Sequence, residues 1–303
     1  MSIEELLTRL SNSDLLDSDL SELSGLDTEQ LALFEQAWGK IETEQRCRIV
    51  SQLVKLADEN VGLNFNVIFK KCLTDPDAEV RRQAIEGLWE CEESSLVPPL
   101  IDLFENDSSE MVQTEAAAAL GRFAMLAEHG KLHETTTTSL GLALLSIISD
   151  ENKPVNIRCC ALEAVAPLSL PGVSNAISEN YQCADDQLNL SSICAMGISC
   201  DPSWLPTLLE ELTNPDAERR RVAASALGEL EEEDAVPQLA ELVYDDDIDV
   251  QIAAIRALGE IGGAEARECL ELCLDDDEET IRLAAEQALD SVGGKEDLQS
   301  FST

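Results

Sequence analysis

The sequence has little of what would direct it toward a β-sheet or a membrane. Aromatic residues make up only 4% of the 303 residues. No window of about six residues alternates β-branched and polar side chains, which is the usual pattern of a strand. No segment approaches the run of about 18 apolar residues that a transmembrane helix needs. The many Ala and Leu residues instead favour an all-helical protein.

Positive charge is also scarce. The chain has 20 Lys and Arg against 61 Asp and Glu, a formal net charge of −41. The one short basic run, Arg219 to Arg221, lies among carboxylates that can pair with it. Nucleic acid and anionic membranes would be repelled, so we expect neither as a partner. Solubility, a cationic partner or a saline cell interior would each explain the acidity.

Groups that carry chemistry are few. The only histidines are His129 and His133, and the chain contains no Gly-rich phosphate loop and no Cys-x-x-Cys. Cys269 and Cys273 stand four apart but lack the further ligands that a structural zinc needs. The acidic runs lack the spacing of an EF-hand loop. We therefore expect no catalytic residue, no metal site and no cofactor.

The ten cysteines do not indicate disulfides. The first residues, "MSIEELLTRL", carry acids where a secretory signal would be positive. Several cysteines fall within helical patterns, where a thiol packs as a small hydrophobe. We therefore expect a reduced, cytoplasmic protein.

The chain does have a long internal repeat. "PDAERRRVAASALGELEEEDAVPQLAELV" from Pro215 is echoed by "DDIDVQIAAIRALGEIGGAEARECLELCL" from Asp246, and Ala-Leu-Gly recurs after 31 residues. Two short helices and two turns have this length, so a helical repeat array is predicted. Further copies are marked by a large apolar anchor at Leu88, Leu120, Val165, Met196, Leu227, Leu258 and Leu289.

Other columns repeat with the anchors. The residue before the anchor is small, and the residues four and eight before it are nearly all small or apolar. Offsets of four and eight lie on one helix face, so the same face is buried in each copy. The Gly that follows the anchor at 121, 197, 228 and 259 indicates tight packing or a helix end.

Turn chemistry supports pairs of helices. Acidic or Asn-containing turns such as "TDPDAEV" from Thr74 precede the first helix of each pair and supply N-caps. Pro98, Pro206 and Pro237 mark the entrances of second helices, because Pro is tolerated in a first turn.

The pattern "DPDAEVRRQAIEGL" from Asp75 and its echoes resemble the HEAT repeat, specifically the short bacterial form of phycobilisome-lyase-like proteins. The resemblance implies a right-handed α-solenoid, a superhelix of helix pairs whose surface binds other proteins. It also implies an arginine seven residues before the anchor on the concave side. That arginine is Arg81, Arg158, Arg220 and Arg282, whereas Gln113, Asn189 and Gln251 depart from the family pattern.

The repeats do not cover the whole chain. Residues 1–43 predict an N-terminal helical cap, with a short helix at Ile3 to Leu10 and Asp27 as the N-cap of a second helix. Residues 44–292 form the repeat solenoid, with an insertion near 128–141 that explains one 45-residue interval. Residues 293–303 are predicted to be a frayed C-terminal tail.

The candidate partner-binding residues are on the first helices. They are Arg81, Arg158, Asn189, Arg220 and Arg282. The fifth copy, "NLSSICAMG", interrupts the apolar pattern with Asn189, Ser191 and Ser192, which suggests a polar contact patch. Alternatively, the arginines pair with aspartates of adjacent turns.

We therefore predict a non-catalytic scaffold, or an assembly or regulatory factor, that is monomeric and binds a protein partner through the solenoid surface. A lyase-like role in bilin attachment or removal, or a role as the partner of such a lyase, is the alternative that the resemblance implies. Deoxyhypusine hydroxylases, another class with these repeats, hold two irons with several His-Glu pairs. This chain has only His133 and Glu134, which disfavours such a site.

Overall fold

The computed structural model describes Leu6 and residues 17–300, and the side chains of this part up to Val292. These residues are helices and turns, with no strand among them. The predicted all-α class is thus confirmed. The short helix expected at Ile3 to Leu10 lies outside the described residues, except for Leu6.

The helices after the first 42 residues alternate between first and second members of pairs. The first helices are α4 (Thr43–Glu59), α6 (Ala78–Gly87), α8 (Glu110–Glu128), α10 (Val155–Val165), α12 (Asp186–Ile198), α14 (Ala217–Leu230), α16 (Ile248–Ile261) and α18 (Glu279–Ser300). The second helices are α5 (Asn66–Cys72), α7 (Val97–Asn106), α9 (Glu134–Ser149), α11 (Val173–Tyr181), α13 (Leu205–Glu211), α15 (Val236–Leu242) and α17 (Gly263–Cys273). Helices α2 (Asp17–Ser21) and α3 (Thr28–Trp38) precede them.

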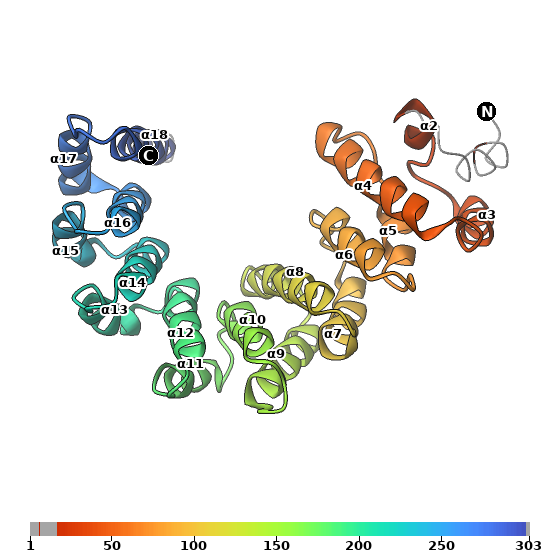
Figure 1. Cartoon of the computed structure of the whole chain (residues 1–303), viewed down its shortest axis with the longest axis horizontal. Helices are drawn as coiled ribbons and strands as arrows, with labels where there is room; N and C mark the ends of the chain where they lie inside the picture. Colours follow the sequence, from red (N-terminus) through yellow and green to blue (C-terminus); the bar gives the residue numbers. More distant parts are fainter. Residues whose placement is uncertain (1–5, 7–16, 301–303) are drawn as a thin grey trace. The chain divides into compact units, whose positions relative to one another are not determined.

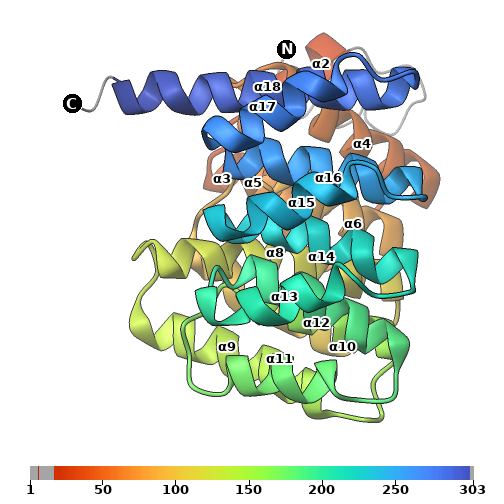
Figure 2. The ribbon, with the colours of Figure 1, turned by 90° about the vertical axis from the view of Figure 1, so that its left-hand side faces the viewer.

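The chain forms two compact units, residues 1–140 (unit 1) and residues 141–303 (unit 2). In unit 1, α4 packs on α6 and α6 packs on α8. In unit 2, first helices from α10 to α18 form one layer, and second helices from α11 to α17 form another (Figures 1 and 2). Each unit is therefore a stack of helix pairs, the architecture of an α-solenoid.

The two units fill their cores differently. The largest buried side chains of unit 1 include five phenylalanines: Phe34, Phe65, Phe69, Phe104 and Phe123. Unit 2 buries mainly Ala, Leu, Ile and Val from the repeated columns. The six anchors from Leu88 to Leu258 are all buried, as predicted, whereas Leu289 is half-buried on the last helix.

Predicted caps and entrances are present. Asp77, Asp185, Asp216 and Asp247 each accept hydrogen bonds from first-turn amides of the helix that follows. Asp27 caps α3 and forms a capping box with Gln30. Pro98, Pro206 and Pro237 lie in the first turns of α7, α13 and α15.

The long interval between Leu120 and Val165 is largely helical. Helix α8 continues to Glu128, and α9 starts at Glu134, so only residues 129–133 connect them. The residues that the spacing predicts as an insertion therefore lengthen a helix pair. The proposed boundaries of the cap, the repeat region and the C-terminal tail stay predictions.

The recurring glycine marks close helix packing and not a helix end. A Cβ on Gly197 would lie 2.6 Å from Cα of Ala226, and one on Gly259 would lie 2.8 Å from Cα of Ala288. Both glycines lie within their helices, since α12 runs to Ile198 and α16 to Ile261. Consecutive first helices therefore touch through backbone atoms at a Gly–Ala contact.

Replacing Gly259 by Ala is expected to lower the free energy of unfolding by about 1–3 kcal/mol, because the new methyl group overlaps the backbone of α18. Gly39→Ala is the matched control: Gly39 has a right-handed backbone conformation and open space where its Cβ would lie. We expect the control to be neutral or slightly more stable. Urea unfolding that finds the two variants equally stable would contradict the Gly–Ala contact.

Leu258→Ala is expected to cost about 2–5 kcal/mol, because this anchor is fully buried and its removal leaves a cavity. Leu283, half-exposed on α18, is the control, and its replacement by Ala should change the stability by less than about 0.5 kcal/mol. Thermal or urea unfolding measures both. A wild-type melting curve for Leu258→Ala would refute the role of the anchor.

Candidate functional site

Arginines on the first helices join neighbouring repeats. Arg46, Arg81 and Arg220 each form two ionic contacts, at 2.7–3.1 Å, with an aspartate in the turn 25 to 29 residues later: Asp75, Asp107 and Asp245. Each also donates to a carbonyl of the turn before its own helix. We call this arrangement the arginine clamp.

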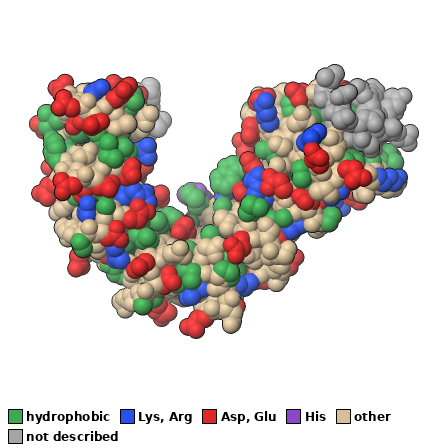
Figure 3. Space-filling model, in the orientation of Figure 1, with side chains coloured by type: hydrophobic (Ala, Val, Ile, Leu, Met, Phe, Trp, Pro, Cys, Tyr) green, Lys and Arg blue, Asp and Glu red, His purple; other side chains and the backbone are tan. Residues whose placement is uncertain are grey.

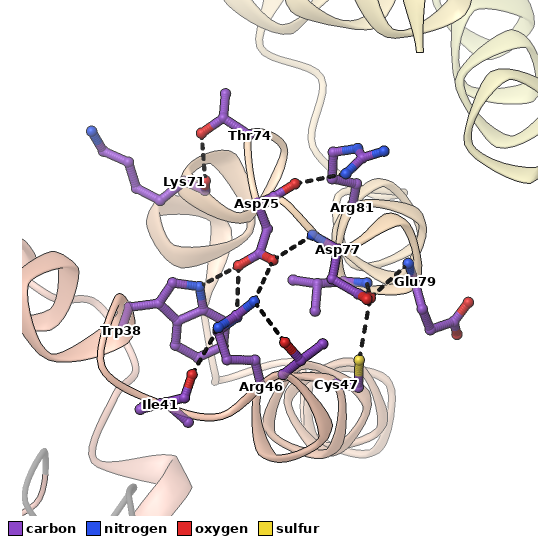
Figure 4. Close-up of polar contacts among 12 residues, drawn as sticks. Trp38, Ile41, Arg46, Cys47, Lys71, Thr74, Asp75, Asp77, Glu79 and Arg81 are labelled. Carbon is purple, nitrogen blue, oxygen red and sulfur yellow. Dashed lines mark hydrogen bonds and ion pairs between the residues drawn. The ribbon is translucent and has the colours of Figure 1, made fainter. Parts of the chain in front are cut away.

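Figure 4 shows the clamp around Asp75. This buried carboxylate accepts from Nε1 of Trp38 at 2.8 Å, from Nη2 of Arg46 at 3.1 Å and from the amide of Asp77 at 2.9 Å. Its main-chain carbonyl accepts from Nη1 of Arg81 at 2.7 Å. One residue thus connects α3, α4, a turn and α6, and its buried charge is fully hydrogen-bonded.

The remaining members of the arginine column make only part of the clamp. Arg158 donates through Nε to the carbonyl of Ile148 at 2.9 Å. Arg282 donates to the carbonyls of Asp276 and Asp277 at 2.7 and 2.9 Å. Gln251, which departs from the family arginine, still donates to the carbonyl of Asp245. Bonding to the preceding turn is therefore retained where the carboxylate partner is missing.

Asn189 is a correction to the sequence analysis. The sequence suggests an exposed polar patch here, but Asn189, Ser191 and Ser192 are buried on α12. Asn189 donates to the carbonyl of Tyr181 and accepts from Nη1 of Arg219. Asn189 lies seven residues before its anchor, Met196, where other repeats have an arginine. Its side chain contacts Tyr181 at the end of α11, in the preceding helix pair.

Arg219 and Glu211 complete this buried cluster. Glu211 is buried and accepts two hydrogen bonds, from Nε of Arg219 at 2.8 Å and from the Tyr181 hydroxyl at 2.5 Å. Burial alone would raise the pKa of Glu211, but the hydrogen bonds from Arg219 and Tyr181 hold that pKa below its usual value. The cluster is an internal ion pair that ties α11, α13 and α14 together.

The five predicted site residues do not converge on one site. Arg81 lies in unit 1, and Arg158, Asn189, Arg220 and Arg282 lie on successive or alternate first helices of unit 2. Each of the five makes hydrogen bonds to other residues of the chain. Partner binding by these five residues stays a prediction, and the alternative of pairing with aspartates has direct contacts in the cases of Arg81 and Arg220. The clamp residue Arg46 was missed, although it stands seven before the buried Leu53.

A different surface follows the repeat and was not singled out from the sequence. On the first helices of unit 2, the residues six and two before each anchor are all exposed or half-buried. We call these ten residues the first-helix face: Cys159, Leu190, Arg221, Ile252 and Leu283, and Glu163, Cys194, Ser225, Arg256 and Gln287. Reading the exposed columns of the repeat, instead of the buried ones, would have found this face.

The first-helix face is nearly free of acid, in a chain of net charge −41. Glu163 is the single carboxyl among its ten residues, and burial raises the pKa of this group. Glu163 also accepts a hydrogen bond from the Ser191 hydroxyl at 2.7 Å. Burial raises the pKa of Cys159 to about 11 and that of Cys194 to about 12, so both thiols stay neutral near pH 7. Figure 3 shows many Asp and Glu side chains on the surface of the chain.

A groove of about 330 Å³ opens on this face between α14 and α16. Arg221, Ser225, Ile252 and Arg256 line it, together with Asp249 and Ala253. Arg221 is paired with Glu218 at 2.6 Å. Arg256 is exposed and has no ion pair among the described residues. The groove is therefore mainly polar, with Ile252 and Ala253 as its apolar part, and the guanidinium of Arg256 is exposed in it.

The His and Cys side chains were the candidates for reactive chemistry. Among residues whose side chains the structure describes, no three His, Cys, Asp or Glu lie close enough to hold a metal ion. Both histidines are exposed, and Nδ1 of His133 lies 3.0 Å from the Thr135 hydroxyl. Cys273 donates to the carbonyl of Cys269 at 3.3 Å. No described helix is both long and apolar enough to span a bilayer.

A family model described as HEAT repeats matches residues 66–136 and 205–290, together more than half of the chain. No curated protein matches the chain in sequence.

Three solved structures are similar to this chain. The complex of CpcE and CpcF of phycocyanin lyase from Nostoc sp. PCC7120 is 16% identical, with a TM-score of 0.51, over 93% of this chain and 96% of that one. An engineered protein is 18% identical, with a TM-score of 0.43, over 96% and 88%. Human deoxyhypusine hydroxylase is 19% identical, with a TM-score of 0.32, over 96% of each chain. At these identities the first of them indicates a shared fold alone.

The clamp predicts a dependence of stability on pH. The hydrogen bonds from Arg220 hold the pKa of Asp245 below its usual value. Because the folded-state pKa is lowered, the stabilisation is present above the unfolded-state pKa of about 3.9 and is lost as pH falls through the folded value. Asp245→Asn should lower the free energy of unfolding by about 1–3 kcal/mol at neutral pH, and the deficit should shrink below about pH 4.

Asp246→Asn is the control, since Asp246 is exposed and makes no recorded bond to Arg220. Urea unfolding of both variants at neutral and acidic pH measures the effect. A deficit for Asp245→Asn that is the same at both pH values would contradict the role of the ion pair.

Proposed function

The chain belongs to the HEAT-repeat family, and we propose that it is a non-catalytic protein-binding scaffold, serving as an assembly or regulatory factor, whose partner binds the first-helix face of unit 2. The observation that supports this most is the scarcity of carboxylates on that face. Taking a charge out of water costs free energy unless the partner compensates it. A partner on the first-helix face would bury mostly apolar and neutral groups.

The shape of the face suits an elongated partner segment. Packed helices lie about 8–10 Å apart, so the five first helices from α10 to α18 extend the face over roughly 30–40 Å. A helix or an extended strand of a partner has this length. Ile252 and Leu283 supply apolar contact area, and the guanidinium of Arg256 can bind a carboxylate or a carbonyl.

The proposal predicts that Ile252→Glu combined with Leu283→Glu abolishes binding, because two carboxylates would enter the apolar face. The tagged full-length chain is used to capture proteins from an extract of its native cells, with chemical cross-linking and mass spectrometry. The matched control is Tyr244→Glu with Leu272→Glu, which also adds two carboxylates at exposed apolar positions, but away from the face.

We expect the wild type and the control to capture the same partner, and the face variant to lose it while its melting temperature is unchanged. Equal capture by all three proteins would overturn the role of the face. Covalent bilin transfer to an acceptor subunit, in an incubation with purified chain, would overturn the non-catalytic part and support the lyase-like alternative.

The predicted monomer also stays a proposal. It follows from the same charge argument, because two chains of net charge −41 repel each other at low salt.

A further inference from the structure

Unit 1 contains a cleft that the proposed function does not use. It lies where α4 and α6 end, and its volume is about 250 Å³, less than the usual range for a drug-sized ligand. The lining residues that the argument uses are Asp58, Val61, Phe69, Glu86, Trp89 and Glu90. The cleft therefore has room for one long side chain of a partner, and not for a folded element.

Trp89 gives the cleft an exposed but fixed aromatic wall. Trp89 is 54% exposed, which is unusual for tryptophan, and Val61, which also lines the cleft, is 95% exposed. The guanidinium of Arg122 lies 5.6 Å from the centre of the Trp89 ring. Arg122 is itself held by the carbonyl of Cys91 at 2.9 Å, and it does not line the cleft. The ring is therefore held in place before any partner binds, which limits the entropy that binding would cost.

Gly87 keeps the floor of the cleft apolar and flat. A Cβ at this position would lie 2.6 Å from two ring atoms of Phe69, so glycine allows that ring to pack directly on α6. Phe65 supports Phe69 in an edge-on contact, with ring centres 6.3 Å apart. Both phenylalanines are buried. The two buried rings thus form a rigid aromatic support beneath the cleft.

Negative charge surrounds this apolar floor. Asp58, Glu86 and Glu90 are exposed, and among the described residues only Glu86 of these three has an ion pair, with Arg82 at 3.1 Å. Helices α4 and α6 both end here, so the negative ends of their dipoles face the same region. No lysine or arginine lines the cleft. A cation is the group whose charge this rim complements.

We propose that this cleft binds an arginine side chain, next to an apolar residue, on an extended segment of a partner protein. The guanidinium plane would stack on Trp89, and its N–H groups would donate to Asp58 and Glu90. The neighbouring apolar side chain would cover Val61. Arginine fits better than lysine because its planar head can stack and donate at once. This site is separate from the first-helix face and does not depend on it.

The test uses the full-length chain and two blocked tetrapeptides, Ala-Leu-Arg-Ala and Ala-Leu-Glu-Ala. Binding is followed through the indole N–H resonance of Trp89 in an NMR titration, identified by its loss in Trp89→Phe. We expect a saturable shift with the arginine peptide, weakened by added salt, and none with the glutamate peptide. Equal shifts with both peptides, or none with either, would overturn the proposal.

Two variants check the assignment through the amide resonances of residues 58–64. Trp89→Ala should lower the affinity for the arginine peptide about tenfold. Asp58→Asn combined with Glu90→Gln should lower that affinity about fivefold. The second variant changes only exposed groups, so it keeps the test valid if Trp89→Ala unfolds.

Tyr244→Ala in unit 2 and the face variant Ile252→Glu with Leu283→Glu should bind the peptide as the wild type does. Wild-type affinity of the Asp58→Asn, Glu90→Gln variant for the arginine peptide would refute the proposed binding site. Because the face variant retains the cleft, failure of this proposal and failure of the proposed function give different results.

Discussion

The close approach of consecutive first helices is the constraint on which the rest of unit 2 depends. Glycine and alanine meet at backbone distance between α12 and α14, and between α16 and α18, so each repeat is held at a short, constant spacing from the next. Anchors such as Leu227 and Leu258 are fully buried. The same spacing brings an arginine of one repeat within reach of an aspartate in the turn of the next. Small residues thus make both the apolar and the polar contacts possible.

The charges of the chain are divided between two tasks. Some carboxylates, such as Asp75, Asp107 and Asp245, are buried or half-buried in turns, where arginines and amides compensate them. Others, such as Asp58 and Glu90, are exposed and without ion pairs among the described residues. The charges of these three aspartates are therefore compensated inside the repeats. The excess of acid is instead present at the surface, where it can select partners.

The two proposed binding surfaces use this surface charge in opposite ways. The first-helix face of unit 2 has almost no carboxylates and offers aliphatic side chains with Arg256. The cleft of unit 1 has the exposed ring of Trp89 as a wall and a rim of carboxylates. A scaffold with two chemically different surfaces can bind two different segments, and HEAT-repeat stacks suit this role because each repeat contacts only its neighbours.

The sequence by itself determined the helix pairs, their caps and their buried faces, because these depend on a local period of 3.6 residues and on a repeat of 31. Asp27, Asp77 and Pro98 could be placed from the residues beside them. Only the tertiary structure decided which polar residues face solvent, since Asn189 and Arg220 occupy the same repeat column and yet one is buried against Tyr181 while the other pairs with Asp245. The tertiary structure also forms the cleft beside Trp89, whose walls come from residues about 30 positions apart. Contacts of that range depend on how helices pack, and a local pattern does not record them.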